Sequence, residues 1–153
     1  MHILELKVPP LALVVFMAVL MWLAARAMPA FGFIVPGRYL LSASLAGAGA
    51  VICGLGIISF RRAGTTVNPM KPDASSSLVV SGIYTVTRNP IYLGFLLVLL
   101  GWAVLLSNVL AFLILPAFMW YMNRFQIYPE EKALTSLFGE EFASYKSQVR
   151  RWL

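Results

Sequence analysis

Four long apolar segments with almost no charge dominate this chain. They cover residues 9–27, 39–60, 91–107 and 109–125, and each is close to the roughly 20 residues that a helix needs to cross a bilayer. The chain is 60% hydrophobic and only 12% charged, whereas a soluble domain carries about 25% charged residues. The sequence therefore predicts an all-α integral membrane protein with about four transmembrane helices.

The turn between the last two segments is short and uncharged, so these segments are expected to form a helical hairpin. At 153 residues the chain is too short for two domains of this kind, and we predict a single domain, 1–153. Its expected parts are two N-terminal spans (1–60), a cytoplasmic loop (61–89), and the hairpin with a C-terminal helix (90–153).

The basic residues are distributed unevenly about the predicted spans. Two of the twelve, Arg26 and Arg38, fall on one side. The other ten fall on the opposite side: Lys7, Arg61, Arg62, Lys71, Arg88, Arg124, Lys132, Lys146, Arg150 and Arg151. By the positive-inside rule, both termini and the loop lie in the cytoplasm of a bacterial inner membrane. The charges are too scattered among apolar spans to form a nucleic-acid surface.

Two residue counts exclude classes of site. Cys53 is the only cysteine and lies in an apolar run, which excludes disulfides and thiolate metal sites within one chain. His2 is the only histidine and lies near the N-terminus. We therefore expect no metal site and no histidine general base.

Helix packing and helix ends can also be predicted. Ala46, Ala50 and Gly54 recur at four-residue spacing, which predicts a small-residue stripe where a neighbouring helix approaches closely. Asn89 is a favoured N-cap and Pro90 a favoured first helical residue. After Pro129, apolar residues at three- and four-residue steps indicate a C-terminal amphipathic helix, and Gly139 is the position at which this helix could be broken. The apolar residues are Leu134, Leu137, Phe138, Phe142, Tyr145 and Val149.

Charged residues meet at the cytoplasmic end of the hairpin. Arg88 and the N–H groups that begin the third span form an expected anion site, and the returning chain brings Glu130 and Glu131 close to it. Tyr84 and Tyr92 flank this site. A ligand with an anionic group, a cationic group and a sulfonium, such as S-adenosylmethionine, fits such a pocket. The residues alone also permit ordinary helix caps and an arginine that reaches lipid headgroups.

Two motifs resemble those of a known family. Residues 82–94, GIYTVTRNPIYLG, resemble the signature of the isoprenylcysteine carboxyl methyltransferase family and its bacterial relatives, which also resemble the phospholipid methyltransferases. The run from Glu130 to Arg150 resembles that family's second signature, and residues 62–65 resemble its bacterial branch. The resemblance covers about residues 60–153.

The resemblance implies a membrane enzyme that methylates a lipophilic small molecule or a membrane lipid from S-adenosylmethionine. It implies catalytic roles for Arg88 and Glu131. Matching the motifs gives these cofactor-binding residues: Tyr84, Arg88, Asn89, Pro90, Tyr92, Gly94, Glu130 and Glu131. Asn89 stands where the eukaryotic members have histidine, so a role that needs an ionisable imidazole is not expected here.

Several functions stay open at this point. A carboxylate or thiol acceptor is the first expectation, and a phospholipid amine, for which Glu130 or Glu131 would accept the proton, is the alternative. A non-catalytic membrane protein that keeps the hairpin is a third possibility. A reductase resembling the sterol reductases is a fourth, although a dinucleotide phosphate calls for more arginines than this pocket offers. The oligomeric state does not follow from the sequence.

Overall fold

The computed structural model describes residues 5–64 and 76–153, so His2, Lys71 and the middle of the predicted loop lie outside the described residues. The long helices are α1 (Pro10–Ala27), α2 (Arg38–Arg62), α3 (Pro90–Leu106), α4 (Val109–Tyr121) and α5 (Tyr128–Gln148). Short 3-10 helices cover Pro29–Phe31 and Gly82–Thr85, and a π-helical segment covers Met122–Ile127. The all-α fold predicted from the sequence is confirmed.

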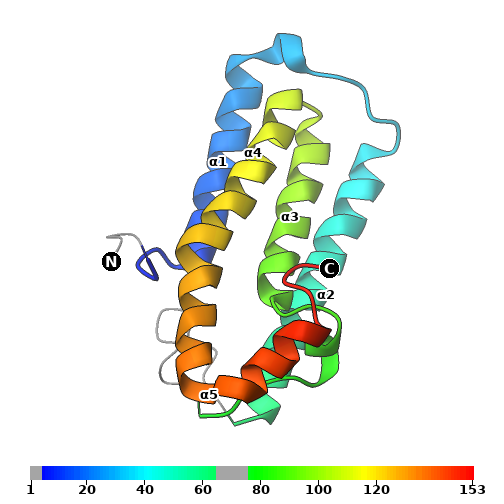
Figure 1. The fold of residues 1–153 in the computed structure, drawn as a ribbon. Helices are drawn as coiled ribbons and strands as arrows, with labels where there is room; N and C mark the ends of the chain where they lie inside the picture. The colour runs from blue at the N-terminus through cyan, green and yellow to red at the C-terminus, as the bar shows by residue number, and fades with distance from the viewer. Residues whose placement is uncertain (1–4, 65–75) are drawn as a thin grey trace.

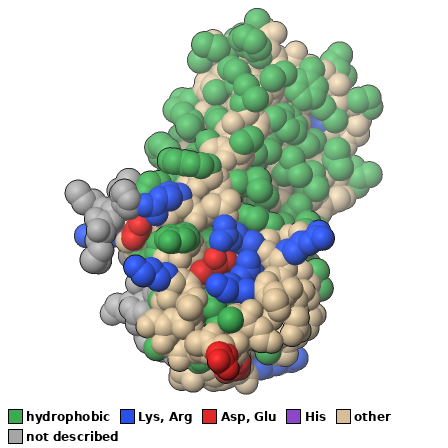
Figure 2. Space-filling model, viewed as in Figure 1, with side chains coloured by type: hydrophobic (Ala, Val, Ile, Leu, Met, Phe, Trp, Pro, Cys, Tyr) green, Lys and Arg blue, Asp and Glu red, His purple; other side chains and the backbone are tan. Residues whose placement is uncertain are grey.

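The first four helices form an elongated bundle (Figure 1). α3 is its central element, because α2 packs mainly against α3 while α1 packs against α3 and α4. α1 and α2 are each long and apolar enough to cross a membrane, and α3 is a shorter apolar helix. Hydrophobic side chains cover the upper part of the molecule and charged ones gather around its lower end (Figure 2). This distribution agrees with a bundle held in a bilayer.

The predicted hairpin between α3 and α4 turns within two residues. Ser107 ends α3 in the left-handed conformation (φ 49°), and Asn108 caps α4 by accepting a 3.0 Å hydrogen bond from the Leu110 N–H. The Asn108 amide also donates to the Met28 carbonyl oxygen at 3.0 Å, which ties the end of α1 to the turn. Both polar groups of a buried side chain are thus satisfied away from the charged end.

Small residues join α2 to α3, but in a different register from the predicted one. Ser42, Gly49 and Gly56 are the buried residues of α2, whereas Ala50 is exposed and a Cβ on Gly54 would meet nothing within 4 Å. The prediction of Ala46, Ala50 and Gly54 as the stripe was therefore wrong for its last two members. A seven-residue spacing drifts by only about 20° around a helix, while a four-residue spacing drifts by about 40° at 3.6 residues per turn.

The chain continues from α4 into α5 through the π-helical segment rather than through a loop. α5 then bends sharply at Gly139 (φ 49°, ψ −119°), and its second half runs beneath the bundle (Figure 1). Phe142 and Tyr145 in that half pack on Val79 and Tyr84. Leu137, predicted on the same apolar stripe, is instead 45% exposed, whereas Leu134 and Phe138 on the same half of α5 pack on this cluster.

Candidate functional site

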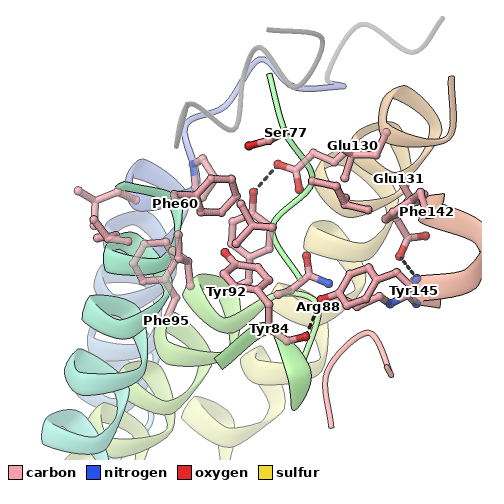
Figure 3. A pocket seen from close by; sticks show the side chains of 18 of the residues that line it. Phe60, Ser77, Tyr84, Arg88, Tyr92, Phe95, Glu130, Glu131, Phe142 and Tyr145 are labelled. Atoms are coloured by element: carbon pink, nitrogen blue, oxygen red, sulfur yellow. Dashed lines mark hydrogen bonds and ion pairs between the residues drawn. The ribbon is translucent and has the colours of Figure 1, made fainter. Parts of the chain in front are cut away.

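A cavity of about 330 Å³ lies at the charged end of the bundle. It is bounded by the ends of α1 and α2, the start of α3, both halves of α5 and the segment from Ser77 to Tyr84 (Figure 3). Its volume is within the usual range for small-molecule sites, about 300–1,000 Å³. The position agrees with the site predicted from the two motifs.

The two ends of this cavity differ in character. Arg88, Asn89, Glu130 and Glu131 form one end. Apolar side chains from three helices form the other: Leu11, Ile57, Phe60, Ile91 and Phe95. A ligand that fills the cavity must therefore combine a charged group with an apolar part.

Arg88 has unused hydrogen-bonding capacity. Its side chain is only 13% exposed and its Nη1 lies 3.3 Å from Oε1 of Glu131, yet Nε and Nη1 are buried with no hydrogen-bond partner among the described residues. The Arg88 backbone N–H donates to the Arg150 carbonyl oxygen at 3.0 Å. Because a buried, unsatisfied guanidinium is costly, this group is suited to an anionic ligand.

Glu131 is held mainly by a second arginine. Nε of Arg151 donates to Oε1 at 3.1 Å and Nη2 of Arg151 donates to Oε2 at 2.6 Å, which is the bidentate geometry that binds carboxylates most strongly. Two guanidinium groups thus share one carboxylate. This corner of the cavity carries a net positive charge.

Glu130 lies in a different environment from its neighbour. Its Oε1 accepts hydrogen bonds from the Tyr92 hydroxyl and, at 2.7 Å, from Nε2 of Gln126. Burial raises the pKa of the Glu130 carboxyl to about 7, the hydrogen bonds from Tyr92 and Gln126 oppose this rise, and the charge of Glu131 adds to it. The two adjacent carboxylates thus differ in their environment: Glu131 is ion-paired, and Glu130 is near its midpoint of titration at neutral pH.

Asn89 occupies the predicted N-cap position, but its side chain makes no capping hydrogen bond. Nδ2 of Asn89 donates instead to the Arg151 carbonyl oxygen at 2.9 Å, so the predicted capping role is wrong. The Asn89 N–H donates to Oγ1 of Thr87 at 3.2 Å. Asn89 therefore connects the start of α3 to the C-terminal residues while it lines the cavity.

Tyr84 and Tyr92 both line the cavity, as the sequence predicted. The Tyr84 ring lies edge-on to Phe60, with the ring centroids 5.4 Å apart, and its carbonyl oxygen accepts a 2.7 Å hydrogen bond from Tyr145. Burial is the main cause that raises the pKa of Tyr84 and brings that of Tyr145 to about 12. Both rings stay neutral and present aromatic surface rather than charge.

Two of the predicted cofactor-binding residues lie at a helix contact instead. A Cβ on Gly94 would meet the Gly49 carbonyl oxygen at 2.5 Å and Cys53 closer still, and Pro90 lies against Gly56. Neither residue lines the cavity. Their position places them between α2 and α3, so a role in binding would be indirect.

The motifs did not identify three other residues at this site. Gln126 precedes Glu130 by four residues on a helical segment, a spacing that was available as a signal. Tyr145 was recognised as part of the apolar stripe and of the second motif but not as a site residue, although its hydroxyl donates to the Tyr84 carbonyl oxygen. Arg151 was counted only as one of the basic residues, and no local pattern links it to Glu131.

Comparison with known proteins identifies a family for this chain. The model of the family described as phospholipid methyltransferase matches residues 37–141. A protein-S-isoprenylcysteine O-methyltransferase of Schizosaccharomyces pombe is 32% identical over 120 residues, which are 78% of this chain and 46% of that protein. The Saccharomyces cerevisiae protein of the same name is 35% identical over 79 residues, covering 52% of this chain and 33% of its own length.

A third relative is an uncharacterized protein of Haemophilus influenzae, 50% identical over 62 residues that make up 40% of this chain and 98% of that protein. The chain spans less than half the length of the two yeast methyltransferases that it matches. Their activity therefore bears on this chain only through the part that it shares.

Proposed function

The chain belongs to the phospholipid methyltransferase family, and from this membership we propose that it transfers a methyl group from S-adenosylmethionine to a small lipophilic acceptor. The observation that supports this most directly is the combination at one cavity of the Arg88 guanidinium, which lacks hydrogen-bond partners among the described residues, and a wall of apolar side chains. The first suits the amino-acid carboxylate of the donor, and the second suits the acceptor.

The residues at the charged end fit the donor group by group. Arg88 would bind its carboxylate, Glu131 or Glu130 its ammonium or ribose hydroxyls, and the tyrosine rings its sulfonium region. Asn89 would add one polar contact at the start of α3. When bound, the donor supplies a methyl group on a positively charged sulfur. Pro90 and Gly94 would act by fixing α3 against α2 rather than by contact.

The chain's own contribution to catalysis is positioning. Arg88 and Glu131, joined at 3.3 Å, would fix the donor at one end so that its methyl group faces the apolar end. Holding two reactants in line in a site that excludes water can supply several kcal/mol of the required acceleration, up to roughly 7–11 kcal/mol. A carboxylate or thiolate acceptor is already nucleophilic, so positioning alone suffices for it.

The acceptor would reach the cavity from the bilayer. Leu11 of α1 and Ile57 of α2 line the apolar end, and Leu11 is 62% exposed on the outside of the bundle. The yeast relatives are named for an isoprenylcysteine substrate, which combines a long apolar chain with a polar end. A phospholipid amine remains the second candidate, because Glu130 lies at the cavity with a carboxyl group able to accept a proton at neutral pH.

The proposed site faces the cytoplasm of a bacterial inner membrane. Arg26 and Arg38 lie at the ends of α1 and α2 away from the cavity, while Arg61, Arg88 and Arg151 lie at the cavity end. By the positive-inside rule, this asymmetry supports the proposal that both termini lie in the cytoplasm. Reporter fusions at residue 153 should therefore read cytoplasmic, and fusions between residues 29 and 36 should read periplasmic.

The proposal is tested by supplying radiolabelled S-adenosylmethionine to native membranes that contain the protein. The label should enter the organic-extractable fraction, because the cavity admits a small lipophilic acceptor. Label that is stable to mild base would favour an amine or thiol product over a carboxyl ester. Label on a gel-resolved protein band would contradict the small acceptor, and no transfer above membranes lacking the protein would contradict the methyltransferase activity.

A further inference from the structure

The last residues of the described chain are attached to the site at several points. The Arg151 carbonyl oxygen accepts hydrogen bonds from Nδ2 of Asn89 and, at 3.3 Å, from Oγ1 of Thr87. The Trp152 indole N–H donates to Oδ1 of Asn123 at 3.1 Å. These contacts fix the backbone of Arg151 between the start of α3 and the π-helical segment, so the position of its side chain is determined by the fold.

The side chains of Arg88 and Arg151 compete for one carboxylate. Arg151 holds both oxygens of Glu131, at 3.1 and 2.6 Å, whereas Arg88 approaches only Oε1, at 3.3 Å. The Arg88 contact is an ion pair without a hydrogen bond. Glu131 is thus committed to Arg151, and the donors of Arg88 stay unpaired although a carboxylate lies beside them.

This division has a consequence for ligand binding. If Arg151 did not hold Glu131, both carboxylate oxygens would be free to rotate onto Arg88, which needs partners for Nε and Nη1. A full internal ion pair would then occupy the guanidinium and compete with any anionic group of a ligand. Two cations that share one anion leave the site positive, whereas one cation with one anion leaves it neutral.

We infer that Arg151 is a positioning residue that keeps Arg88 available for the carboxylate of the ligand by holding Glu131 in a bidentate ion pair. The inference rests on the proposed function, because it takes the amino-acid part of the methyl donor as the ligand of Arg88. Arg151 is not among the residues that line the cavity, so its effect passes through Glu131. Its contribution is therefore specific to ligands that carry a carboxylate.

The adjacent residue provides a matched control. Arg150 has an exposed side chain and takes part in the site only through its carbonyl oxygen, which accepts the Arg88 N–H. Arg150→Gln removes the same charge one position away and leaves that backbone contact in place. An effect that arises only from lowering the net positive charge of this end of the molecule should therefore appear in both variants.

The test measures the binding of two probes to purified, full-length protein by calorimetry. S-adenosylhomocysteine carries the carboxylate, and decarboxylated S-adenosylhomocysteine keeps the ammonium and the adenosine but lacks it. Arg151→Gln should lower the affinity for S-adenosylhomocysteine about tenfold or more and leave the affinity for the decarboxylated probe unchanged. Arg151→Lys should fall between wild type and Arg151→Gln, because an ammonium cannot reproduce the fork. Arg150→Gln should match wild type with both probes.

Two results would overturn the inference. One is wild-type affinity of Arg151→Gln for S-adenosylhomocysteine, and the other is an equal loss of both probes, which would mean that Arg151 only supports the fold. If Arg151→Gln does not purify as a single folded species, Arg151→Lys decides by the same difference between probes. Wild-type protein that binds neither probe would instead overturn the proposed function, and the inference with it.

Discussion

The flank and the N-terminal end of α3 are built on opposite principles. Along the flank, Gly94 and Gly101 bring α3 against the backbone of α2, where an added Cβ would lie 2.5 Å from the Gly49 carbonyl oxygen and 2.9 Å from that of Ser42. At the end, less than two helical turns from Gly94, Arg88 lines a cavity, and its Nε and Nη1 have no hydrogen-bond partner among the described residues. One surface has no free space, and the other has space and unused donors.

The difference shows how a small membrane protein can hold a buried side chain whose hydrogen-bond donors have no partner. Close packing between small residues supplies the van der Waals contact that holds helices together in lipid. A rigid α3 then fixes where Arg88, Asn89 and Tyr92 lie, so that the site does not close on itself. Buried polar groups without partners are expected at sites where a ligand completes them.

The largest effect is expected on the packed flank. Gly94→Leu should destabilise the protein by about 3 kcal/mol or more, because the new side chain must displace the backbone of α2. Thermal unfolding in detergent and elution as a single species measure this effect. Gly54→Leu is the matched control, because Gly54 lies in α2 and a Cβ added there would meet nothing within 4 Å. Equal stability of the two variants would contradict the close contact.

The next effect is expected at the site. Arg88→Ala should weaken S-adenosylhomocysteine binding by about 1.5–3 kcal/mol, the usual contribution of a hydrogen bond to a charged group, with the unfolding temperature almost unchanged. Arg61→Ala removes an exposed arginine from the same end of the molecule and should bind as wild type. The two regions would not be separable if Arg88→Ala lowered the unfolding temperature as much as Gly94→Leu does.

The third prediction concerns the pH dependence of stability. The pKa of Glu130 is raised from 4.5 to about 7 in the folded protein, so folding favours the protonated form. Stability should therefore fall as pH rises from about 4.5 to about 7 and then level off. Comparison of unfolding temperatures between pH 5 and 8 should show this component in wild type and in Glu140→Gln, an exposed control, but not in Glu130→Gln. Parallel curves for all three proteins would contradict the environment described for Glu130.

The smallest effect is expected for Asn89. Asn89→Ala removes its hydrogen bond to the Arg151 carbonyl oxygen, at a cost of about 1 kcal/mol. Affinity for S-adenosylhomocysteine should fall by no more than about fivefold. A loss as large as that of Arg88→Ala would contradict this ranking, because it would mean that Asn89 contributes as much to ligand binding as the Arg88 guanidinium.

The sequence predicted those features that depend on local pattern. Apolar runs and the short turn at Ser107 and Asn108 predicted the hairpin, and the hairpin in turn predicted that Glu131 lies near Arg88, which the structure confirms at 3.3 Å. The family suggested by the two motifs is also confirmed. These predictions succeeded because each follows from segment length, a turn or a motif that can be read along the chain.

The features that the sequence did not predict depend on tertiary contact. Asn89 is a good N-cap by composition, but the carbonyl oxygen of a residue 62 positions away takes its amide instead. The role of Arg151 depends on the same distant segment. A backbone carbonyl oxygen is present in every residue, so a sequence does not show which one will accept a hydrogen bond. The prediction of the α2 stripe failed for a geometric reason. Small residues recur at both four-residue and seven-residue spacing in the sequence, and only the contact with α3 selects between the two.

The central claim is that the cavity beside Arg88 is a site for S-adenosylmethionine. Calorimetric titration of purified wild-type protein with S-adenosylhomocysteine tests it most directly, with NADPH titrated in parallel. We expect saturable binding of S-adenosylhomocysteine in the micromolar range, near −8 kcal/mol, or about 1 μM, and no binding of NADPH. Binding of NADPH with no response to S-adenosylhomocysteine would contradict the claim and favour a dinucleotide-dependent reductase.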